Sequence, residues 1–336
     1  SHTTASYQKT NRNTRRQYEK DARYGNHYSV YFDGAGDFYR SYQSAHGLGL
    51  LDSSFSAFAW VKFPTDLALS EDGTIISFGA NDPTFDIRLA VKETSFAASY
   101  LYAESYSGVY DVFSTPANSI VPGQWHHVGL TCRYNGDGGI TTGSLYIDGT
   151  LHASSATSSF SASLWASSSI GIGNEDTYVQ TYDFRGLISE VAVWNTELTG
   201  TAISQLYKFG SNMPGPCDLN LHPASASLVT WYRMGDEDPQ AFGPGMEATI
   251  LRDSSQKQSD ATLYSDSINN PVLVMDAPPG SYTPYPGKFE ALKVTKSGVF
   301  NGTTTVVIGD AATTVGALQM GDNFTLSMWI KPETPV

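Results

Sequence analysis

The stretch GQWHHVGLTCRYNGDGGITTGSLYIDGTL, residues 123–151, shows the pattern from which the fold is predicted. In residues 125–132 the side chains fall into two alternating sets, and the alternation returns in residues 143–151. Successive side chains of a strand point to opposite faces of a sheet, so a period of two indicates strands. Asp148-Gly149 is a dipeptide typical of a tight hairpin turn. The stretch therefore predicts a β-hairpin.

The two histidines in this stretch, His126 and His127, invite a metal-site or catalytic interpretation. They are adjacent, however, and on a strand they face opposite sides of the sheet. One metal ion could not bind both without distortion, and no further ligands follow at the spacings that zinc sites use. We therefore predict that both histidines are structural.

The same alternation continues along the chain in short runs, for example in residues 28–42, 54–64 and 184–194. Proline and glycine separate the runs and act as turn signals. After the last run, Ile203, Leu206 and Tyr207 recur at helical spacing, which predicts a short amphipathic helix that begins at Thr199. The pattern thus indicates many strands and few helices.

Composition and charge agree with this interpretation and exclude several classes of protein. The 336 residues include 31 Gly and 20 Tyr, only 16% are charged, and the net charge is −13. An acidic chain is a poor partner for nucleic acid, and no apolar run approaches the roughly 20 residues of a membrane helix. Cys132 and Cys217 are too few for a disulfide framework, and we favour two reduced thiols over a single bridge.

Residues 1–25 differ from the rest, because they carry six basic side chains against two acidic ones. They contain no apolar core of a signal peptide. This arm is either a disordered tail or a docking arm that becomes ordered against an acidic partner. In the second case the docking residues are Arg12, Arg15, Arg16, Lys20 and Arg23.

Five short motifs occur in order in residues 32–34, 55–62, 123–128, 145–149 and 184–191. Together they resemble the concanavalin A-like lectin/glucanase superfamily, in its laminin-G-like and pentraxin-like branch. The resemblance implies an all-β fold, in which two antiparallel sheets pack as a jelly-roll sandwich. In such a fold the tryptophans at 60, 125 and 194 serve mainly in packing.

A repeat indicates how the chain is divided. The pattern of residues 30–64 returns near residues 298–332, and residues 228–264 resemble the opening of a tandem copy. We therefore expect an arm at 1–25, a first laminin-G-like jelly roll at 26–212, a linker at 213–227 and the first part of a second jelly roll at 228–336. The second copy would be incomplete, so either the sequence is a piece of a longer chain, which we favour, or another chain completes the fold.

The resemblance also implies a calcium site, because pentraxin-like members bind calcium through an acidic cluster late in the domain and an earlier loop. Calcium prefers carboxylate, amide and carbonyl oxygens. The residues at matching positions are Asn174, Glu175 and Asp176 in the late cluster and Asp82 in the early loop. Asp33 marks a second position that other laminin-G-like members use, although Ser189 replaces the usual Asp there. The alternative is that these are solvated acidic loops.

Catalysis is not expected. Retaining glycosidases of this superfamily need two carboxylates on one face of a strand, and the sequence has no run with that spacing. Sugar binding would instead use aromatic rings in loop segments together with polar groups. The candidate residues are Tyr110, Trp165, Tyr178 and Tyr182.

These observations favour a non-enzymatic protein of a virus particle, most simply a structural, decoration or tail-adhesion protein of a bacteriophage. Its basic arm would bind other virion proteins, and its lectin-like domains would contact host-surface glycans. The alternatives are a secreted carbohydrate-binding module and an accessory domain of a glycoside hydrolase. No cofactor other than calcium is expected, and the oligomeric state, a homo-oligomer included, is left open.

Overall fold

The computed structural model describes residues 28–65, 72–79, 85–93, 99–106, 110–136, 139–155, 164, 166–174, 182–208, 215–234, 247–264 and 270–279. The chain divides into a unit at residues 1–283 and a unit at residues 284–336. All the described residues belong to the first unit.

Two antiparallel sheets form the first unit, as the alternation predicted. Sheet A consists, in spatial order, of β10 (Thr150–Ser154), β9 (Ile140–Ile147), β8 (Trp125–Tyr134), β3 (Phe55–Lys62), β12 (Arg185–Trp194), β1 (Ser29–Asp33) and β16 (Val272–Val274), with β13 (Leu228–Tyr232) also paired to β12. Sheet B consists of β14 (Ile250–Leu251), β15 (Ala261–Tyr264), β2 (Phe38–Ser41), β11 (Ser169–Ile172), β4 (Asp72–Gly79), β5 (Phe85–Glu93), β6 (Ser99–Tyr106) and β7 (Tyr110–Ser114). The all-β jelly-roll prediction is confirmed.

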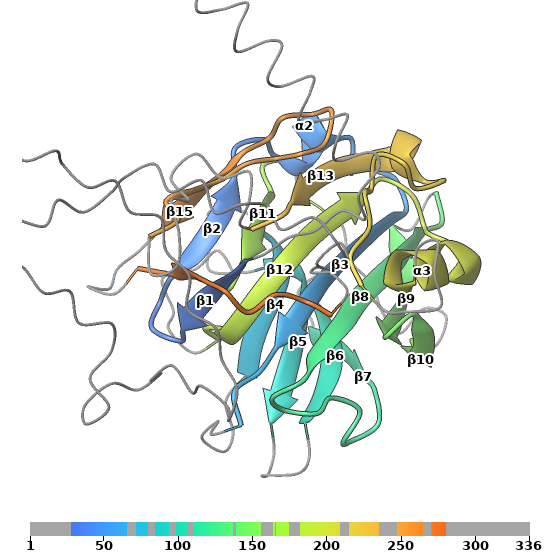
Figure 1. Ribbon diagram of the computed structural model, residues 1–336. Helices are drawn as coiled ribbons and strands as arrows, with labels where there is room; N and C mark the ends of the chain where they lie inside the picture. The colour runs from blue at the N-terminus through green and yellow to red at the C-terminus, as the bar shows by residue number, and fades with distance from the viewer. Residues whose placement is uncertain are drawn as a thin grey trace, which may run out of the picture. The chain divides into compact units, whose positions relative to one another are not determined.

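The main core lies between the two sheets, which are layered in Figure 1. Sheet A contributes side chains such as Val61 and Leu130, and sheet B contributes Ile76, Leu89 and Leu101, all almost fully buried. On β3 and β5 every second residue enters this core, because neighbouring side chains point to opposite faces. The alternating partners therefore form the outer faces of the sheets.

Helices are few in the described part of the chain. They are α2 (Ala45–Leu48), the 3₁₀ turn η1 (Ser225–Ser227) and α3 (Gly200–Tyr207). The predicted amphipathic helix is α3, and its N-cap is Thr199, whose hydroxyl accepts a hydrogen bond from the Ala202 amide at 3.2 Å. It lies beside β10 at one end of sheet A (Figure 1).

A second, smaller core covers the outer face of sheet A, between the sheet and α3. Ile203 and Leu206 of α3 pack there with Phe58 and Trp194 of the sheet. Gly129 lets the Phe58 ring lie flat on the neighbouring strand, since a Cβ at Gly129 would come within 2.0 Å of that ring. A cavity of about 20 Å³ remains in this core, which is room for one water molecule and far too little for a sugar.

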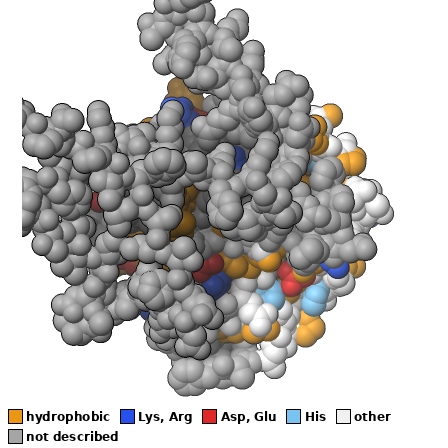
Figure 2. Space-filling view, viewed as in Figure 1, with side chains coloured by type: hydrophobic (Ala, Val, Ile, Leu, Met, Phe, Trp, Pro, Cys, Tyr) orange, Lys and Arg blue, Asp and Glu red, His pale blue; other side chains and the backbone are white. Residues whose placement is uncertain are grey.

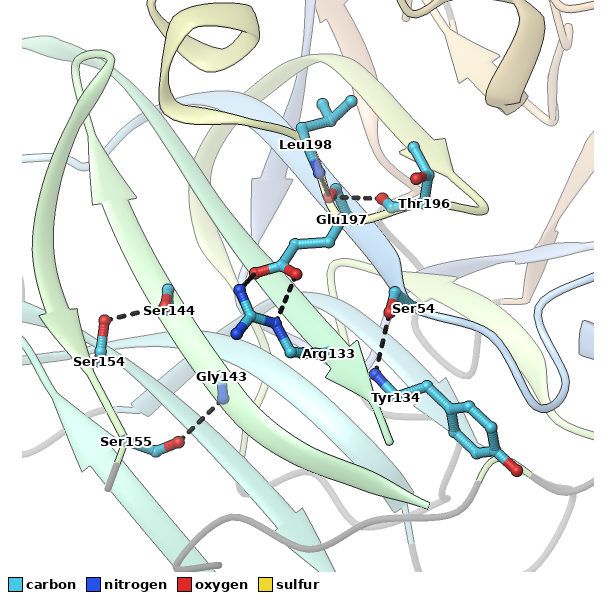
Figure 3. Close-up of polar contacts among 11 residues, drawn as sticks. Ser54, Arg133, Tyr134, Gly143, Ser144, Ser154, Ser155, Thr196, Glu197 and Leu198 are labelled. Carbon is cyan, nitrogen blue, oxygen red and sulfur yellow. Dashed lines mark hydrogen bonds and ion pairs between the residues drawn. The ribbon is translucent and has the colours of Figure 1, made fainter. Parts of the chain in front are cut away.

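Polar contacts tie the strands of sheet A to the segment that follows β12 (Figure 3). Arg133 of β8 makes two hydrogen bonds of 2.8 and 3.0 Å to the carboxylate of Glu197. The Ser144 and Ser154 hydroxyls join β9 to β10 at 2.9 Å. These exposed contacts each contribute little energy. The Arg133–Glu197 pair links β8 to the segment that leads into α3.

Residues 228–274 differ from the predicted division of the chain. β13 pairs with β12, β16 pairs with β1 and β15 pairs with β2, so this region supplies strands to both sheets of the sandwich. The first jelly roll therefore does not close at residue 212, and residues 228–274 belong to it. The repeat near residues 298–332 lies outside the described residues, and a second copy there stays a prediction.

Both cysteines are free and buried, as the sequence favoured. Cys132 lies in the main core and Cys217 in the second core, so sheet A separates them. Burial raises the pKa of both thiols and keeps them protonated. Among the described residues, no helix is long and apolar enough to cross a membrane.

Candidate functional site

The outer face of sheet B carries a group of polar and aromatic side chains from neighbouring strands. On β5 the core positions are Ile87, Leu89 and Val91. Arg88 and Lys92 alternate with these core residues and therefore point to the opposite, outer face. The strand register then shows which residues of β4 and β6 share that face.

One row across the sheet consists of Ser77, Arg88 and Glu104, which are register partners on β4, β5 and β6. Arg88 and Glu104 form a buried ion pair, with the guanidinium Nε 2.8 Å from the Glu104 carboxylate. The Arg88 guanidinium also lies 3.9 Å from the centre of the Tyr182 ring. A buried charge of each sign is thus neutralised by the other.

Two further rows lie beside the first on the same face. Thr74, Ala90 and Tyr102 form one of them, and Asp72, Lys92 and Tyr100 form the other. Lys92 Nζ is 3.2 Å from Asp72 Oδ2.

Three polar atoms in these two rows are buried and have no hydrogen-bond partner. They are the hydroxyl oxygens of Tyr102 and Thr74 and the Oδ1 atom of Asp72. Tyr102 is 4% exposed and Thr74 is fully buried. Buried polar groups in proteins nearly always have partners, and exceptions point to a water molecule, an ion or a ligand. Burial also raises the pKa of Tyr102, so its hydroxyl stays neutral and can both donate and accept.

A pair of polar residues lies where the chain leaves β11 and approaches β12. The Asn174 side-chain amide donates a hydrogen bond to Asp183 Oδ1. Asn174 Oδ1 is buried and has no hydrogen-bond partner. The Ser77 hydroxyl donates to the Asn174 carbonyl at 3.0 Å, which places the pair at the margin of the outer face of sheet B.

Asp183 was missed by the sequence reasoning, although it directly precedes the Phe184-Arg185-Gly186 motif and belongs to the same loop as Asn174. An amide oxygen without a partner beside a carboxylate suits a hard cation, so these two residues fit part of the predicted calcium site. The residues that would complete the set, Glu175, Asp176 and Asp82, lie outside the described residues.

Asp33, the other predicted calcium ligand, ends β1. Its Oδ1 atom accepts a hydrogen bond from the Ala35 amide at 3.0 Å within the turn that follows. In the described part of the chain, no group of three or more His, Cys, Asp or Glu side chains is arranged to hold a metal ion. Calcium binding at Asp33 stays a prediction.

Of the four predicted sugar-contacting aromatics, Tyr182 lies at the outer face of sheet B, against Arg88. Tyr110 begins β7, on the same sheet, but its side chain is outside the described residues. Trp165, Tyr178 and the basic arm residues Arg12, Arg15, Arg16, Lys20 and Arg23 also lie outside them. The structure thus joins Tyr182 to a group that the sequence did not identify, namely Asp72, Thr74, Arg88, Tyr102 and Glu104.

The two histidines of β8 are structural, as predicted. His126 Nε2 accepts a hydrogen bond from the Val121 amide, and its Nδ1 lies 2.9 Å from Asp148 Oδ2. His127 is stacked on Phe58, with ring centres 5.3 Å apart. Val121 and Asp148 thus hold the His126 ring, and the aromatic ring of Phe58 in the second core holds the His127 ring.

A lectin-like β-sandwich is the class of protein that this fold and this polar, aromatic face define. The chain belongs to the concanavalin A-like lectin/glucanases superfamily, because the Laminin_G_3 family model matches residues 33–204. Comparison with curated protein sequences finds no match.

Several solved structures resemble the chain at low identity. One is a heptameric SAP-like pentraxin from Limulus polyphemus, with 18% identity, a TM-score of 0.44 and coverage of 57% of this chain and 86% of the pentraxin. Another is the sialidase CBM40 of Ruminococcus gnavus bound to α2,3-sialyllactose, with 14% identity, a TM-score of 0.40 and coverage of 53% and 95%. A third is tailspike protein 2 of an Escherichia coli O157:H7 bacteriophage, with 11% identity, a TM-score of 0.41 and coverage of 61% and 30%.

Proposed function

We propose that this domain is a non-enzymatic carbohydrate-binding module that binds glycans on the outer face of sheet B. The observation that supports the proposal is the set of buried, unpartnered polar atoms on Asp72, Thr74 and Tyr102 beside the rings of Tyr102 and Tyr182. Sugar sites combine aromatic surface with a few fixed polar groups, and this face of sheet B offers both.

The proposal that the module is non-enzymatic is supported by the state of its carboxylates. Glu104 is held by Arg88, and Asp72 is held by Lys92. A glycosidase needs one carboxylic acid that is protonated and a second that is free to attack or to activate water. Each of these two carboxylates is thus engaged by a cation, Glu104 by Arg88 and Asp72, through its Oδ2 atom, by Lys92.

Glycan binding is tested by removing the exposed part of the site. Tyr182→Ala should abolish or greatly weaken the binding of glycans captured from an oligosaccharide array. Tyr134→Ala is the matched control, because Tyr134 is also a partly buried tyrosine but lies on sheet A, where its hydroxyl is 3.2 Å from Asp52. Equal binding by both variants, with unchanged melting temperatures, would count against the site.

We also propose that calcium binds at Asn174 with Asp183, completed by Glu175 and Asp176. Bound calcium would supply a fixed positive charge that orients glycan hydroxyls, while the protein supplies the ligands. Added calcium should raise the melting temperature and a chelator should reverse the rise, because a ligand that binds only the folded state stabilises it. Asn174→Ala should remove this dependence, and a wild-type chain that melts identically with calcium and with chelator would exclude the site.

For the protein as a whole, we propose a structural or adhesive role on a virus particle, with the basic arm binding other virion proteins and the module contacting host glycans. The alternative is a secreted carbohydrate-binding module, which the fold supports equally well. Deleting residues 1–25 and measuring incorporation into particles separates the two, since undiminished incorporation would remove the docking role of the arm.

A further inference from the structure

We infer that the outer face of sheet B selects uncharged glycans and discriminates against sialylated or sulfated ones. This inference rests on the proposed carbohydrate-binding function and specifies the class of ligand. It follows from how the charges on this face are paired and from which atoms remain without partners.

The cations next to the unpartnered atoms are already neutralised by the protein. Arg88 is paired with Glu104 at 2.5 Å, and Lys92 is paired with Asp72 at 3.2 Å. A ligand carboxylate or sulfate would have to compete with these internal carboxylates. Breaking the buried Arg88–Glu104 pair would leave a buried charge without compensation, which is strongly unfavourable.

The buried atoms that have no partner suit hydroxyl groups. Asp72 Oδ1 is an acceptor only, and the Tyr102 and Thr74 hydroxyls both donate and accept. A sugar hydroxyl can donate to the carboxylate oxygen and exchange hydrogen bonds with both protein hydroxyls. An anionic group cannot donate to Asp72 and would be repelled by it.

The net charge of the chain also disfavours the binding of anionic glycans. The net charge is −13, and the 25-residue arm is basic, so the remaining residues are more acidic still. On the face shown in Figure 2, acidic, basic and apolar side chains of the described part are interspersed. A negatively charged protein slows the approach of anionic glycans and leaves neutral ones unaffected.

Arg40 of β2 is a further cation on this face, and it lies away from the site. The register places Gly171 and Ser77 between Arg40 and Arg88, so the two guanidiniums are three strands apart, and neighbouring strands are separated by about 4.8 Å. Arg40 is stacked on the Tyr264 ring at 4.4 Å. It therefore lies too far from Tyr102 to serve the same sugar ring.

The test uses an array of neutral oligosaccharides printed beside the same glycans capped with sialic acid or carrying sulfate. The full chain should bind members of the neutral set, and capping should reduce binding by about tenfold or more. Preferential binding of the acidic set would overturn the inference and leave the proposed function intact. Failure to bind any glycan would remove both.

A pair of tyrosine variants places the binding on this face. Tyr102→Phe removes a hydroxyl that has no partner in the protein, so affinity for the neutral glycan should fall roughly three- to tenfold while the melting temperature is unchanged. Tyr39→Phe removes a buried hydroxyl that donates to the Ala248 carbonyl at 2.5 Å, so it should lower the melting temperature and leave affinity unchanged. Unchanged affinity in Tyr102→Phe would show that the neutral glycan binds elsewhere and would overturn the inference.

Discussion

At the scale of single residues, His127 shows how a polar ring is held in an apolar environment. Its ring centre lies 5.3 Å from that of Phe58, 5.2 Å from that of Trp60 and 6.3 Å from that of Tyr207. Burial lowers the pKa of His127 to about 4, because the charged imidazolium cannot be solvated there. The ring is therefore neutral at physiological pH and acts as one more flat side chain of the second core.

This depressed pKa predicts a pH dependence of stability. An unfolded histidine titrates near 6.5 and His127 near 4, so between these values the unfolded state binds more protons. The stability that follows from keeping His127 neutral is fully present above pH 6.5 and is lost as the pH falls to about 4. The loss lowers the free energy of unfolding by about 3 kcal/mol. Denaturant unfolding of the wild type and of His127→Phe at pH 7 and at pH 4 isolates the effect.

Between pH 7 and pH 4 the His127→Phe variant should lose about 3 kcal/mol less free energy of unfolding than the wild type. His152→Gln is the control, because it removes a histidine that lies exposed on β10 and not in the second core. If His127→Phe and the wild type lose stability in parallel, the imidazole does not titrate as its burial requires.

Residue-scale prediction from the sequence succeeds where the chemistry is local. Two adjacent histidines on a strand must diverge, and His126 and His127 do. Tyr182 was named as a candidate because a tyrosine in a loop is a usual sugar contact, and its contact with a sugar stays a prediction. Asp72 and Tyr102 were missed, because alternation separates the two faces of a strand but does not reveal which side chains from different strands become neighbours.

At the scale of elements, α3 is a short helix that depends on its cap and on the surface that it covers. Its residues Ile203 and Leu206 are buried against the second core. Eight residues are too few for a stable isolated helix. The Thr199 hydroxyl satisfies one of the free amides of the first turn, at Ala202.

Thr199→Ala should therefore lower the free energy of unfolding by about 1 kcal/mol, the usual cost of losing an N-cap. Gly200→Ala is the matched control at the next position. A Cβ there would meet no atom within 4 Å, so alanine should be neutral or slightly stabilising. Both are measured by denaturant unfolding, and a larger loss in Gly200→Ala than in Thr199→Ala would contradict this account of the cap.

Elements were the level at which the sequence was most informative. The strands follow from alternation and the helix from its spacing and cap, because both patterns are local. Strand partners are not local, however. The LVTWY run at residues 228–232 resembles a strand that opens a new domain, and it pairs instead with β12, at the centre of the same sheet. The resemblance to the family identified residues 228–232 as a strand, but it could not identify β12 as the strand with which they pair.

At the scale of the whole molecule, this pairing makes the sandwich depend on residues that follow the predicted boundary at 212. Val229, Trp231, Tyr232, Leu251 and Leu273 are buried there almost completely. Burial of a large apolar side chain contributes about 1.5–3 kcal/mol. The five together therefore contribute on the order of 10 kcal/mol, comparable to the whole stability of a typical domain.

A chain that ends at residue 227 should consequently fail to fold, whereas a chain that ends at residue 283 should unfold cooperatively. Loss of β13 and β16 would also leave β12 and β1 with unpaired edges, which favour aggregation. Circular dichroism melting and size-exclusion chromatography of the two chains distinguish the outcomes. A cooperative, monomeric transition in the shorter chain would restore the boundary predicted from the sequence, because residues 228–274 would then be dispensable to the first sandwich.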